Sequence, residues 1–554
     1  MASRHKVVIY QLLPRLFGNT NTTRKENGSL EENGCGKLND INMTVLKRIR
    51  SLGVSHVWYT GVLRHATTTD YTAYGIPSQH AEIVKGRAGS PYAITDYYDI
   101  DPDLATVVPE RINEWEALIS RTHKAGMKVV MDFVPNHVAR EYHSVAKPSG
   151  VVDLGAHDNN QQAFSPSNNF YYCTNIGFAP SFDRGNYVEF PAKATGNDVF
   201  SPHPTRNDWY ETVKLNYGVD YMASYGHQNH FSPVPDTWLK MTDILLYWAS
   251  KGVDAFRCDM AEMVPTAFWS YATAKLNRLY PDVILIGEVY NPWRYQDYVD
   301  AGFTYLYDKV GMYDCLRDVV CGKKPASEIT NQWQHTAQIR QHMLYFLENH
   351  DEQRIGSDYF AADPLKAIPA LVVSTLLSQN PFLLYAGQEF GERGMDAEGF
   401  SGCDGRTTIF DYWCVDSLRR GYYSRRKLTE RETETEAIYK KVLSIATQEK
   451  AVTQGKDFDL MYENPHLSGK QFAFLRKADD DILLVVANFS ENRVDLPVKI
   501  PAHAFDYLSI NEGMYDAVDL LSGQSTRIFM TPDGKINVTI SPHFARIYKI
   551  GGLE

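Results

Sequence analysis

Cysteine is scarce in this sequence, with seven among 554 residues and no Cys-x-x-Cys pair. An odd number of scattered cysteines fits free thiols in a reducing compartment better than a disulfide framework or a zinc site. The first residues also lack the apolar segment and small-residue cleavage site of a signal peptide. We therefore expect a cytoplasmic protein, or a periplasmic or secreted one if an export signal has been removed.

Long apolar runs and a basic surplus are also missing. No run of about 18 apolar residues occurs, so we expect no membrane span. Lysine and arginine total 56 against 67 aspartates and glutamates, which gives a net charge of -11. A chain with no cation surplus cannot readily neutralise phosphates, so nucleic acid and anionic membranes are not expected partners. The oligomeric state is left open.

Two nucleotide-binding signatures are absent as well. The sequence has no G-x-G-x-x-G after its first apolar run and no G-x-x-x-x-G-K-[ST] loop. Because such loops cradle phosphates, a nicotinamide-dependent or nucleotide-dependent enzyme is disfavoured. The aspartate-rich segment 96–103 is interpreted as a turn leading into a helix rather than as a metal site.

What is present is the composition of a globular protein, 44% hydrophobic and 22% charged. The length exceeds one typical domain and predicts a large domain with smaller attachments. Aromatic residues make up 12%, including 35 tyrosines. That abundance fits either a rich core or a cleft that stacks sugar rings.

Short apolar runs alternate with longer helix-like segments over most of the chain. The eight candidate strands span residues 7–10, 56–59, 129–134, 253–257, 283–287, 303–307, 343–347 and 382–385. The candidate helices between them include residues 43–50, 112–125, 237–251, 266–279 and 365–377. This alternation predicts an α/β fold with a parallel sheet, and eight units predict a closed (β/α)8 TIM barrel.

Two parts of the chain depart from the alternation. Residues 137–235, after the third strand, are too many for a bare loop and predict a small inserted domain. Residues 453–554 predict a C-terminal antiparallel β-sandwich, with β-rich runs at 472–475, 482–489, 494–500 and 544–550. The barrel then consists of residues 1–136 and 236–452.

Charged residues gather where four candidate strands end. They lie in the segments Asp132-Phe-Val-Pro-Asn-His137, Arg257-Cys-Asp259, Gly-Glu288 and Glu-Asn-His350-Asp351. Alone, each acid is commonly a helix cap or a surface group, and each histidine is commonly structural. In a barrel, however, the carboxyl ends of all strands meet at one rim. Three carboxylates, one arginine and two histidines at one rim predict a catalytic site, where like charges raise a carboxyl pKa.

These blocks resemble the four sequence regions of the α-amylase family, family 13 of the glycoside hydrolases, in the family's order. The resemblance covers nearly the whole chain, including the inserted domain and the β-rich tail. It implies a retaining mechanism in which Asp259 attacks the anomeric carbon and forms a covalent glycosyl-enzyme. Glu288 would protonate the leaving oxygen and then activate water or an acceptor hydroxyl, from roughly 5 Å away. Asp351 would bind sugar hydroxyls and favour the distorted ring.

The resemblance also implies substrate-binding residues around these acids. Arg257 would keep Asp259 ionised through its charge. His137 and His350 would bind hydroxyls of the reacting ring.

Tyr92, in Ser-Pro-Tyr92-Ala, matches the family's aromatic residue that stacks under the reacting ring, with a core tyrosine as the alternative. Arg354 would line the same cleft. Tyr290 and Trp293 would form a platform for the acceptor, or pack in the core.

The sequence departs from the family pattern at positions that bear on metal and specificity. Lys214 stands where the inserted domain often has an aspartate that helps to hold a structural calcium. Calcium needs several oxygen ligands, which an ammonium could replace, and residues 19–23 lack the acids of another calcium loop. We expect no metal ligands and no required cofactor; a structural calcium stays possible, but its usual site is altered. Glu262 stands where many α-amylases have lysine, near the acceptor subsites, so α-amylase-like specificity is left open.

We predict a retaining hydrolase that cleaves α-1,4-glucosidic bonds of starch, glycogen or maltooligosaccharides, with the α-glucan as its partner. Two alternatives stay open: an α-glucanotransferase, which would use the same residues, and an α-1,6-active enzyme of the neopullulanase or debranching type. A non-catalytic carbohydrate-binding relative is a distant alternative, because it predicts loss of one or more of the three carboxylates.

Overall fold

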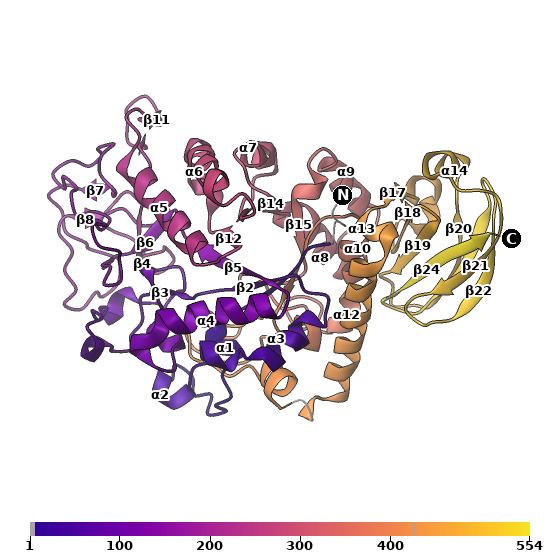
Figure 1. The fold of residues 1–554 in the computed structure, drawn as a ribbon, viewed down its shortest axis with the longest axis horizontal. Helices are drawn as coiled ribbons and strands as arrows, with labels where there is room; N and C mark the ends of the chain where they lie inside the picture. Colours follow the sequence, from indigo (N-terminus) through magenta and orange to yellow (C-terminus); the bar gives the residue numbers. More distant parts are fainter. Residues whose placement is uncertain (1–5, 425–426, 554) are drawn as a thin grey trace.

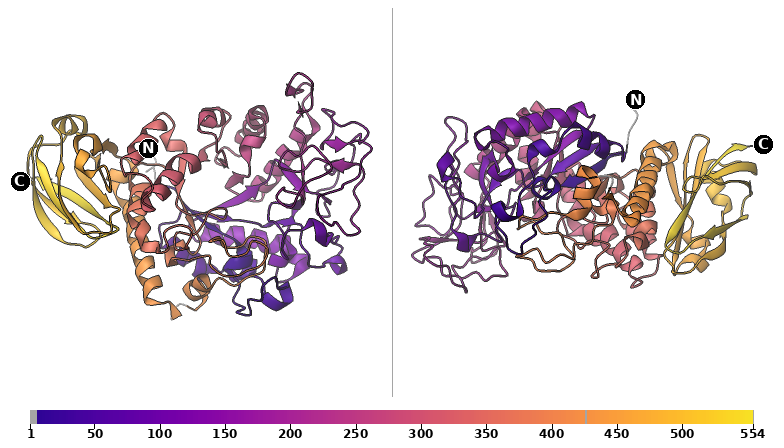
Figure 2. Two further views of the ribbon diagram at one scale, coloured as in Figure 1. Left: turned by 180° about the vertical axis from the view of Figure 1, so that it is seen from behind. Right: turned by 90° about the horizontal axis from the view of Figure 1, so that it is seen from below.

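The computed structural model describes residues 6–424 and 427–553. A barrel lies in the middle of the molecule, with residues 137–235 on one side and the antiparallel C-terminal strands on the other (Figure 1). Both turned views keep the C-terminal strands at one end, beyond a long helix (Figure 2). The chain therefore consists of a central barrel with an attachment on each side.

Eight parallel strands close the barrel in the order β1-β16-β15-β14-β13-β12-β5-β2. Their bounds are β1 Val8–Leu12, β2 His56–Tyr59, β5 Lys128–Phe133, β12 Ala255–Cys258, β13 Ile284–Gly287, β14 Tyr305–Tyr307, β15 Met343–Phe346 and β16 Phe382–Tyr385. β1 closes the barrel, because it pairs with β2 on one side and with β16 on the other. The predicted barrel is confirmed, and each predicted strand lies within two residues of the observed ends.

The barrel strands are buried on both faces. Alternate residues of a strand point to opposite sides, into the barrel and toward the surrounding helices. Ile9, Trp58, Val130 and Leu383 share one small buried cluster, whereas their chain neighbours, such as Val57, belong to the large cluster that includes the helices. Burial on both faces explains why these runs are continuously apolar in the sequence.

The helices around the barrel include α3 (Met43–Arg50), α4 (Arg111–Lys124), α5 (Asp236–Ser250), α6 (Thr266–Leu279) and α10 (Ile368–Leu376), close to the five predicted segments. Sequence analysis did not identify α12 (Glu430–Gln448), whose N-terminal Thr429 forms a capping box with Glu432. In the described part of the chain, no helix combines the length and the apolar character needed to cross a membrane.

The segment between β5 and α5 contains only short strands. β6 (His137–Ala139) pairs with β9 (Thr212–Lys214), so that His137 lies opposite Lys214. Two further pairs are β7 (Tyr172–Cys173) with β8 (Ala192–Lys193) and β10 (Val219–Asp220) with β11 (Gln228–Asn229). The β6–β9 pair starts four residues after the end of β5, the third barrel strand, and so brings this segment to the rim. The boundaries 137–235 stay a prediction.

The C-terminal part is antiparallel, as predicted. Six strands form one sheet in the order β17-β18-β19-β24-β21-β22, and β20 pairs with β23 in a second sheet. The bounds are β17 Lys456–Asp459, β18 Gln471–Ala478, β19 Asp481–Asn488, β20 Val494–Lys499, β21 Gly513–Asp519, β22 Ser525–Met530, β23 Lys535–Ile540 and β24 Phe544–Leu553. The predicted runs correspond to β18, β19, β20 and β24. β17, β21, β22 and β23 were not identified, because they lack the continuous apolar runs of β18 and β19; β23, for example, alternates buried and exposed residues.

The interpretation of residues 96–103 as a turn leading into a helix was wrong for residues 96–100, although a short 3-10 helix, η4 (Pro102–Leu104), does follow them. Residues 94–100 form β4 (Ile94–Ile100), which pairs with β3 (Leu63–His65). The aspartates that suggested a turn are buried and paired: Asp96 lies 3.3 Å from Arg64, and Asp99 lies 2.6 Å from Arg111. The sequence does not show these partners, because they lie far along the chain, so a buried charged strand was interpreted as a turn.

Candidate active site

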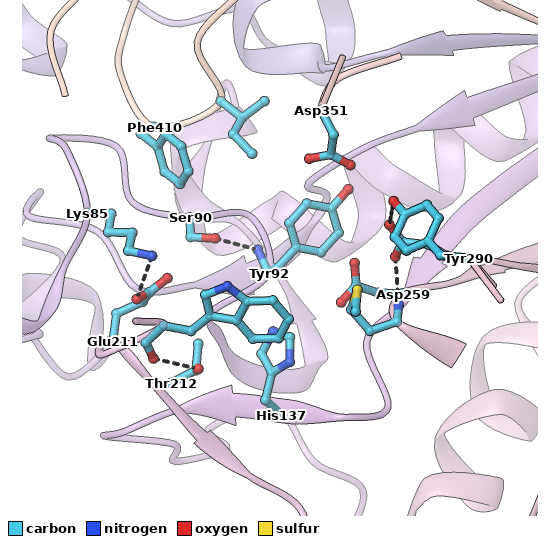
Figure 3. A pocket seen from close by; sticks show the side chains of 14 residues that line it. Lys85, Ser90, Tyr92, His137, Glu211, Thr212, Asp259, Tyr290, Asp351 and Phe410 are labelled. Atoms are coloured by element: carbon cyan, nitrogen blue, oxygen red, sulfur yellow. Dashed lines mark hydrogen bonds and ion pairs between the residues drawn. The ribbon is translucent and has the colours of Figure 1, made fainter. Parts of the chain in front are cut away.

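The carboxyl ends of the barrel strands surround one pocket. Asp259 directly follows β12, Glu288 directly follows β13, and Asp351 comes five residues after the end of β15. All three line a pocket of about 260 Å³, together with Tyr92 and His137 among other residues (Figure 3). The three carboxylates that sequence analysis singled out are therefore neighbours in space.

The Arg257 guanidinium contacts several acids of this rim. Its Nη1 donates to Asp259 Oδ1 at 2.7 Å, and its Nη2 lies 2.9 Å from Glu288 Oε2. Asp132 Oδ1 lies 3.7 Å from the same guanidinium, and Nε donates to the Tyr307 hydroxyl at 3.3 Å. The Arg257 side chain is fully buried, so its charge is weakly screened and fixes the two nearer carboxylates on one planar group.

Burial and charge act in opposite directions on Asp259. Burial raises the pKa of this carboxyl well above its ordinary value of 3.8, the Arg257 guanidinium lowers it, and the Glu288 carboxylate adds a further increase. Removal of the guanidinium would leave only the effects that favour the protonated acid.

Glu288 accepts hydrogen bonds from both of its neighbouring loops. The Met260 backbone N–H donates to Oε2 at 2.7 Å, and the Tyr290 hydroxyl donates to Oε1 at 2.5 Å. Met260 has a left-handed φ of 44°, which a side chain larger than glycine adopts only at some cost. This conformation directs the amide that follows Asp259 toward Glu288 and so couples the two strand ends.

Glu262 supports the loop after Glu288. Its Oε2 accepts hydrogen bonds from the backbone N–H groups of Tyr290 at 2.6 Å and Asn291 at 2.9 Å. Sequence analysis placed Glu262 near the acceptor subsites, and the structure adds a positioning contact. A lysine at this position could not accept these two bonds.

His350 connects Asp351 to Tyr92. Its Nε2 lies 3.0 Å from Asp351 Oδ2 and 2.6 Å from the Tyr92 hydroxyl, and its Nδ1 contacts Gln11 Nε2 at 2.7 Å. Desolvation acts to raise the pKa of Asp351, but His350 and the more distant Arg257 outweigh it, so that this pKa lies below its ordinary value. The surroundings of Asp351 thus favour its ionised form.

His137 lies on the opposite wall. Burial, together with the charges of Lys214 and Lys85, lowers the pKa of His137 to about 3, so the imidazole is neutral at physiological pH. Its ring packs against Trp209 with centroids 5.2 Å apart. A neutral imidazole can accept or donate a hydrogen bond to a sugar hydroxyl.

Four of the residues with expected roles are not among those that line this pocket. Arg257 and His350 are buried and contact acids that do line it, whereas Arg354 and Trp293 lie elsewhere. Arg354 does not line this pocket: it is buried, pairs with Glu348 at 2.9 Å and donates to the Ala386 carbonyl oxygen at 3.0 Å. Trp293 is 83% exposed, outside the pocket. Tyr290 does line the pocket.

Sequence reasoning missed several pocket residues. Lys85, Trp209, Glu211 and Phe410 all come from loops or short strands without a periodic pattern. No sequence signal places such segments at the rim, because their positions depend on how the attachments pack on the barrel.

The position where the family often has a calcium-binding aspartate contains an ammonium group. Lys214 Nζ lies 2.7 Å from Asn136 Oδ1 and 2.6 Å from Asp198 Oδ1, and the lysine side chain is buried. The oxygens that could ligate a cation here already surround the Lys214 charge, so these residues do not fit a calcium ion. Asn19 and Asn21, in the other suspected loop, use their side-chain amides on backbone carbonyl groups.

Known proteins resemble this chain over most of its length. Alpha-amylase 3 from Dictyoglomus thermophilum is 24% identical over 424 residues, 73% of this chain and 74% of that protein. Neopullulanase 2 from Thermoactinomyces vulgaris is 20% identical over 552 residues, 97% of this chain and 76% of that protein. The solved α-amylase of Geobacillus thermoleovorans, complexed with acarbose, has 16% identity and a TM-score of 0.66, with 100% of both chains covered. This last similarity demonstrates the fold alone.

The family model described as "Alpha amylase, catalytic domain" matches residues 11–457. This match takes in all eight barrel strands except the first three residues of β1, and it includes the three rim carboxylates. The protein belongs to the α-amylase family, family 13 of the glycoside hydrolases.

Proposed function

We propose that this protein hydrolyses α-1,4-glucosidic bonds of starch, glycogen or maltooligosaccharides with retention of configuration. The observation that carries the proposal is the buried Arg257 guanidinium, which contacts both Asp259 and Glu288, two acids that line the pocket. Two carboxylates on one guanidinium lie close together, which supports the roughly 5 Å spacing of retaining enzymes over the wider spacing of inverting ones.

In the proposed mechanism, Asp259 attacks the anomeric carbon while Glu288 gives its proton to the leaving oxygen. Asp259 then carries the glycosyl group, and Glu288 takes a proton from water as the water releases the sugar. The Arg257 charge lowers the pKa of Asp259 and so opposes the increase that burial causes, which favours the ionised nucleophile. Asp351, held in its ionised form, would bind hydroxyls of the distorted ring, and the neutral His137 would bind another from the opposite wall.

A second candidate function is transfer of the glycosyl group to a sugar, with α-1,6-active cleavage as a further variant. Tyr290 lines the pocket beside Glu288, where an aromatic ring would favour a sugar acceptor over water. The relative named neopullulanase keeps the second variant open.

We also propose that the protein needs no cofactor and that the Lys214 ammonium takes the place of the structural calcium. Its contacts with Asn136 and Asp198 support this.

The product profile on maltoheptaose tests the proposed function. Shorter sugars alone indicate hydrolysis, longer sugars indicate transfer, and cleavage of pullulan or branched dextrins alone indicates α-1,6 activity. Asp259→Asn should abolish turnover, and Asp243→Asn, at an exposed aspartate on α5, is the matched control. Full turnover in Asp259→Asn would refute the site.

A further inference from the structure

The pocket continues past the reacting groups to a charged pair. Figure 3 shows Lys85 and Glu211 at one end of the pocket and Tyr290 at the other, with Tyr92 and His137 between them. Neither Lys85 nor Glu211 has a role in the mechanism proposed above.

Glu211 is an unusual group for a pocket wall. It is only 4% exposed, and its Oε2 forms an ion pair with Lys85 Nζ at 3.1 Å. Within the described residues, no donor makes a well-aligned hydrogen bond to this oxygen. Burial raises the pKa of Glu211, and the Lys85 charge opposes that increase. A buried carboxylate oxygen without a full set of donors costs free energy that a ligand hydroxyl could recover.

The position of the pair identifies the part of the substrate that reaches it. Glu288 would protonate the leaving group, and the Tyr290 hydroxyl contacts Glu288, so the leaving group lies at the Tyr290 end. The opposite end must therefore receive the sugar units attached to the reacting unit on its donor side.

The chemistry of this end fits a neutral, hydroxyl-rich ligand. Trp209 and Phe410 provide aromatic walls, while Lys85 supplies a donor and Glu211 an acceptor. The carboxylate would repel a phosphate group, and the pair has no net charge to attract an ion.

We propose that Lys85 and Glu211 form a specificity-determining pair that binds hydroxyls of the second sugar unit on the donor side. This inference rests on the proposed function. It makes the enzyme selective for donors of two or more glucose units over donors of one.

The test compares kcat/KM for 4-nitrophenyl α-maltoside and 4-nitrophenyl α-glucoside in the wild type, Glu211→Gln and Lys85→Met. The wild type should prefer the maltoside, and Glu211→Gln should reduce the maltoside-to-glucoside ratio by about 10- to 100-fold, as expected for a lost hydrogen bond to a charged group. Lys85→Met should reduce it in the same direction. If glucoside turnover is too slow to detect, the fall in maltoside kcat/KM relative to the control measures the same effect.

Glu82→Gln is the matched control, because Glu82 pairs with Arg206 at 3.3 Å on the surface and does not line the pocket. It should leave the ratio unchanged. An unchanged ratio in Glu211→Gln, or an equal fall in Glu82→Gln, would overturn the proposed pair while leaving the hydrolase assignment intact. A wild type that cleaves neither donor nor maltoheptaose would refute the proposed function itself.

Discussion

Two fully buried arginines lie at the same rim of the barrel, and they differ in what surrounds them. Arg257 contacts carboxylates that line a pocket. Arg354 instead contacts groups that do not line the pocket. Arg354 pairs with Glu348, donates to Thr407 and the Ala386 carbonyl oxygen, and lies 3.9 Å from the Tyr385 ring centroid.

This difference distinguishes an arginine that acts on catalytic acids, Arg257, from one that stabilises the fold, Arg354. Each side-chain nitrogen of Arg354 has an acceptor within the protein, so its contribution is to hold the segments after β15 and β16 together. Burial raises the pKa of its partner Glu348 to about 7 even though Arg354 opposes that increase. Three carboxylates lie near the single charge of Arg257, and two of them, Asp259 and Glu288, line a pocket that a substrate could occupy. A buried arginine near a rim is therefore not by itself a sign of a substrate site.

The largest expected effect comes from Arg257→Gln. Without the guanidinium, burial and Glu288 would favour the protonated form of Asp259, so kcat/KM should fall by about 10³-fold. Steady-state kinetics on maltoheptaose measures this, with circular dichroism to check folding. If the folded variant lost less than tenfold in kcat/KM, Arg257 would not differ from Arg354 in acting on catalysis.

Arg354→Gln should act on stability instead. Loss of one partner of a buried ion pair costs about 3–5 kcal/mol, so the unfolding temperature should fall while the folded fraction keeps its kcat. The double change Arg354→Met with Glu348→Leu should recover much of this loss, because no buried charge then remains unpaired. A loss of kcat without a loss of stability in Arg354→Gln would place this arginine in the cleft, as the sequence suggested.

Glu262→Ala tests the positioning contact beside the site. Without the carboxylate, the N–H groups of Tyr290 and Asn291 lose their acceptor, and the Tyr290 hydroxyl should no longer be held on Glu288. We expect kcat to fall about tenfold with little change in KM, because only the alignment of the acid is affected. Glu262→Gln, which keeps an acceptor oxygen, should recover most of the activity; equal losses in both variants would argue against positioning.

Two histidines extend the comparison to pH. Burial lowers the pKa of His56 to about 4 and that of His137 to about 3, from an ordinary value of 6.5. Below about pH 6.5 these histidines are protonated in the unfolded chain but stay neutral in the folded chain. The free energy of unfolding therefore falls as the pH drops toward the two lowered pKa values. His56→Asn, outside the pocket, should flatten this dependence without changing kcat, whereas His137→Asn should also lower kcat/KM. Urea unfolding from pH 7 to pH 4 measures the slope, and an unchanged slope in both variants would contradict the assignment.

The smallest expected effect is that of a chelator. If the Lys214 ammonium replaces a calcium ion, EDTA should change neither the unfolding temperature nor the activity. Lys214→Met should destabilise the protein, because Asn136 and Asp198 would lose their shared partner. Inactivation by EDTA that calcium reverses would contradict the proposal.

The sequence was most informative where local pattern and global fold agree. The barrel strands could be predicted because burial on both faces makes them continuously apolar, and Asp259 and Glu288 follow such strands directly. Predictions from the sequence were wrong where contacts between distant segments determine whether a residue is buried. The burial of Asp96 depends on Arg64, and the enclosure of Arg354 depends on Ala386.

Pocket residues in irregular segments could not be predicted either, because contacts between distant segments determine their positions. Glu211 and Phe410 reach the pocket only because the inserted segment and the loop after β16 pack against the rim. No periodicity marks them in the sequence.

The most direct test of the central claim is to trap the covalent intermediate. Glu288→Gln, given an α-maltosyl fluoride, needs no acid to release the leaving group but lacks the base that would activate water. Mass spectrometry of the digested protein should then find one maltosyl group on the peptide that contains Asp259, and none when Asp259→Asn is added. An adduct on another residue, or release of the β-anomer without any adduct in the wild type, would contradict the account.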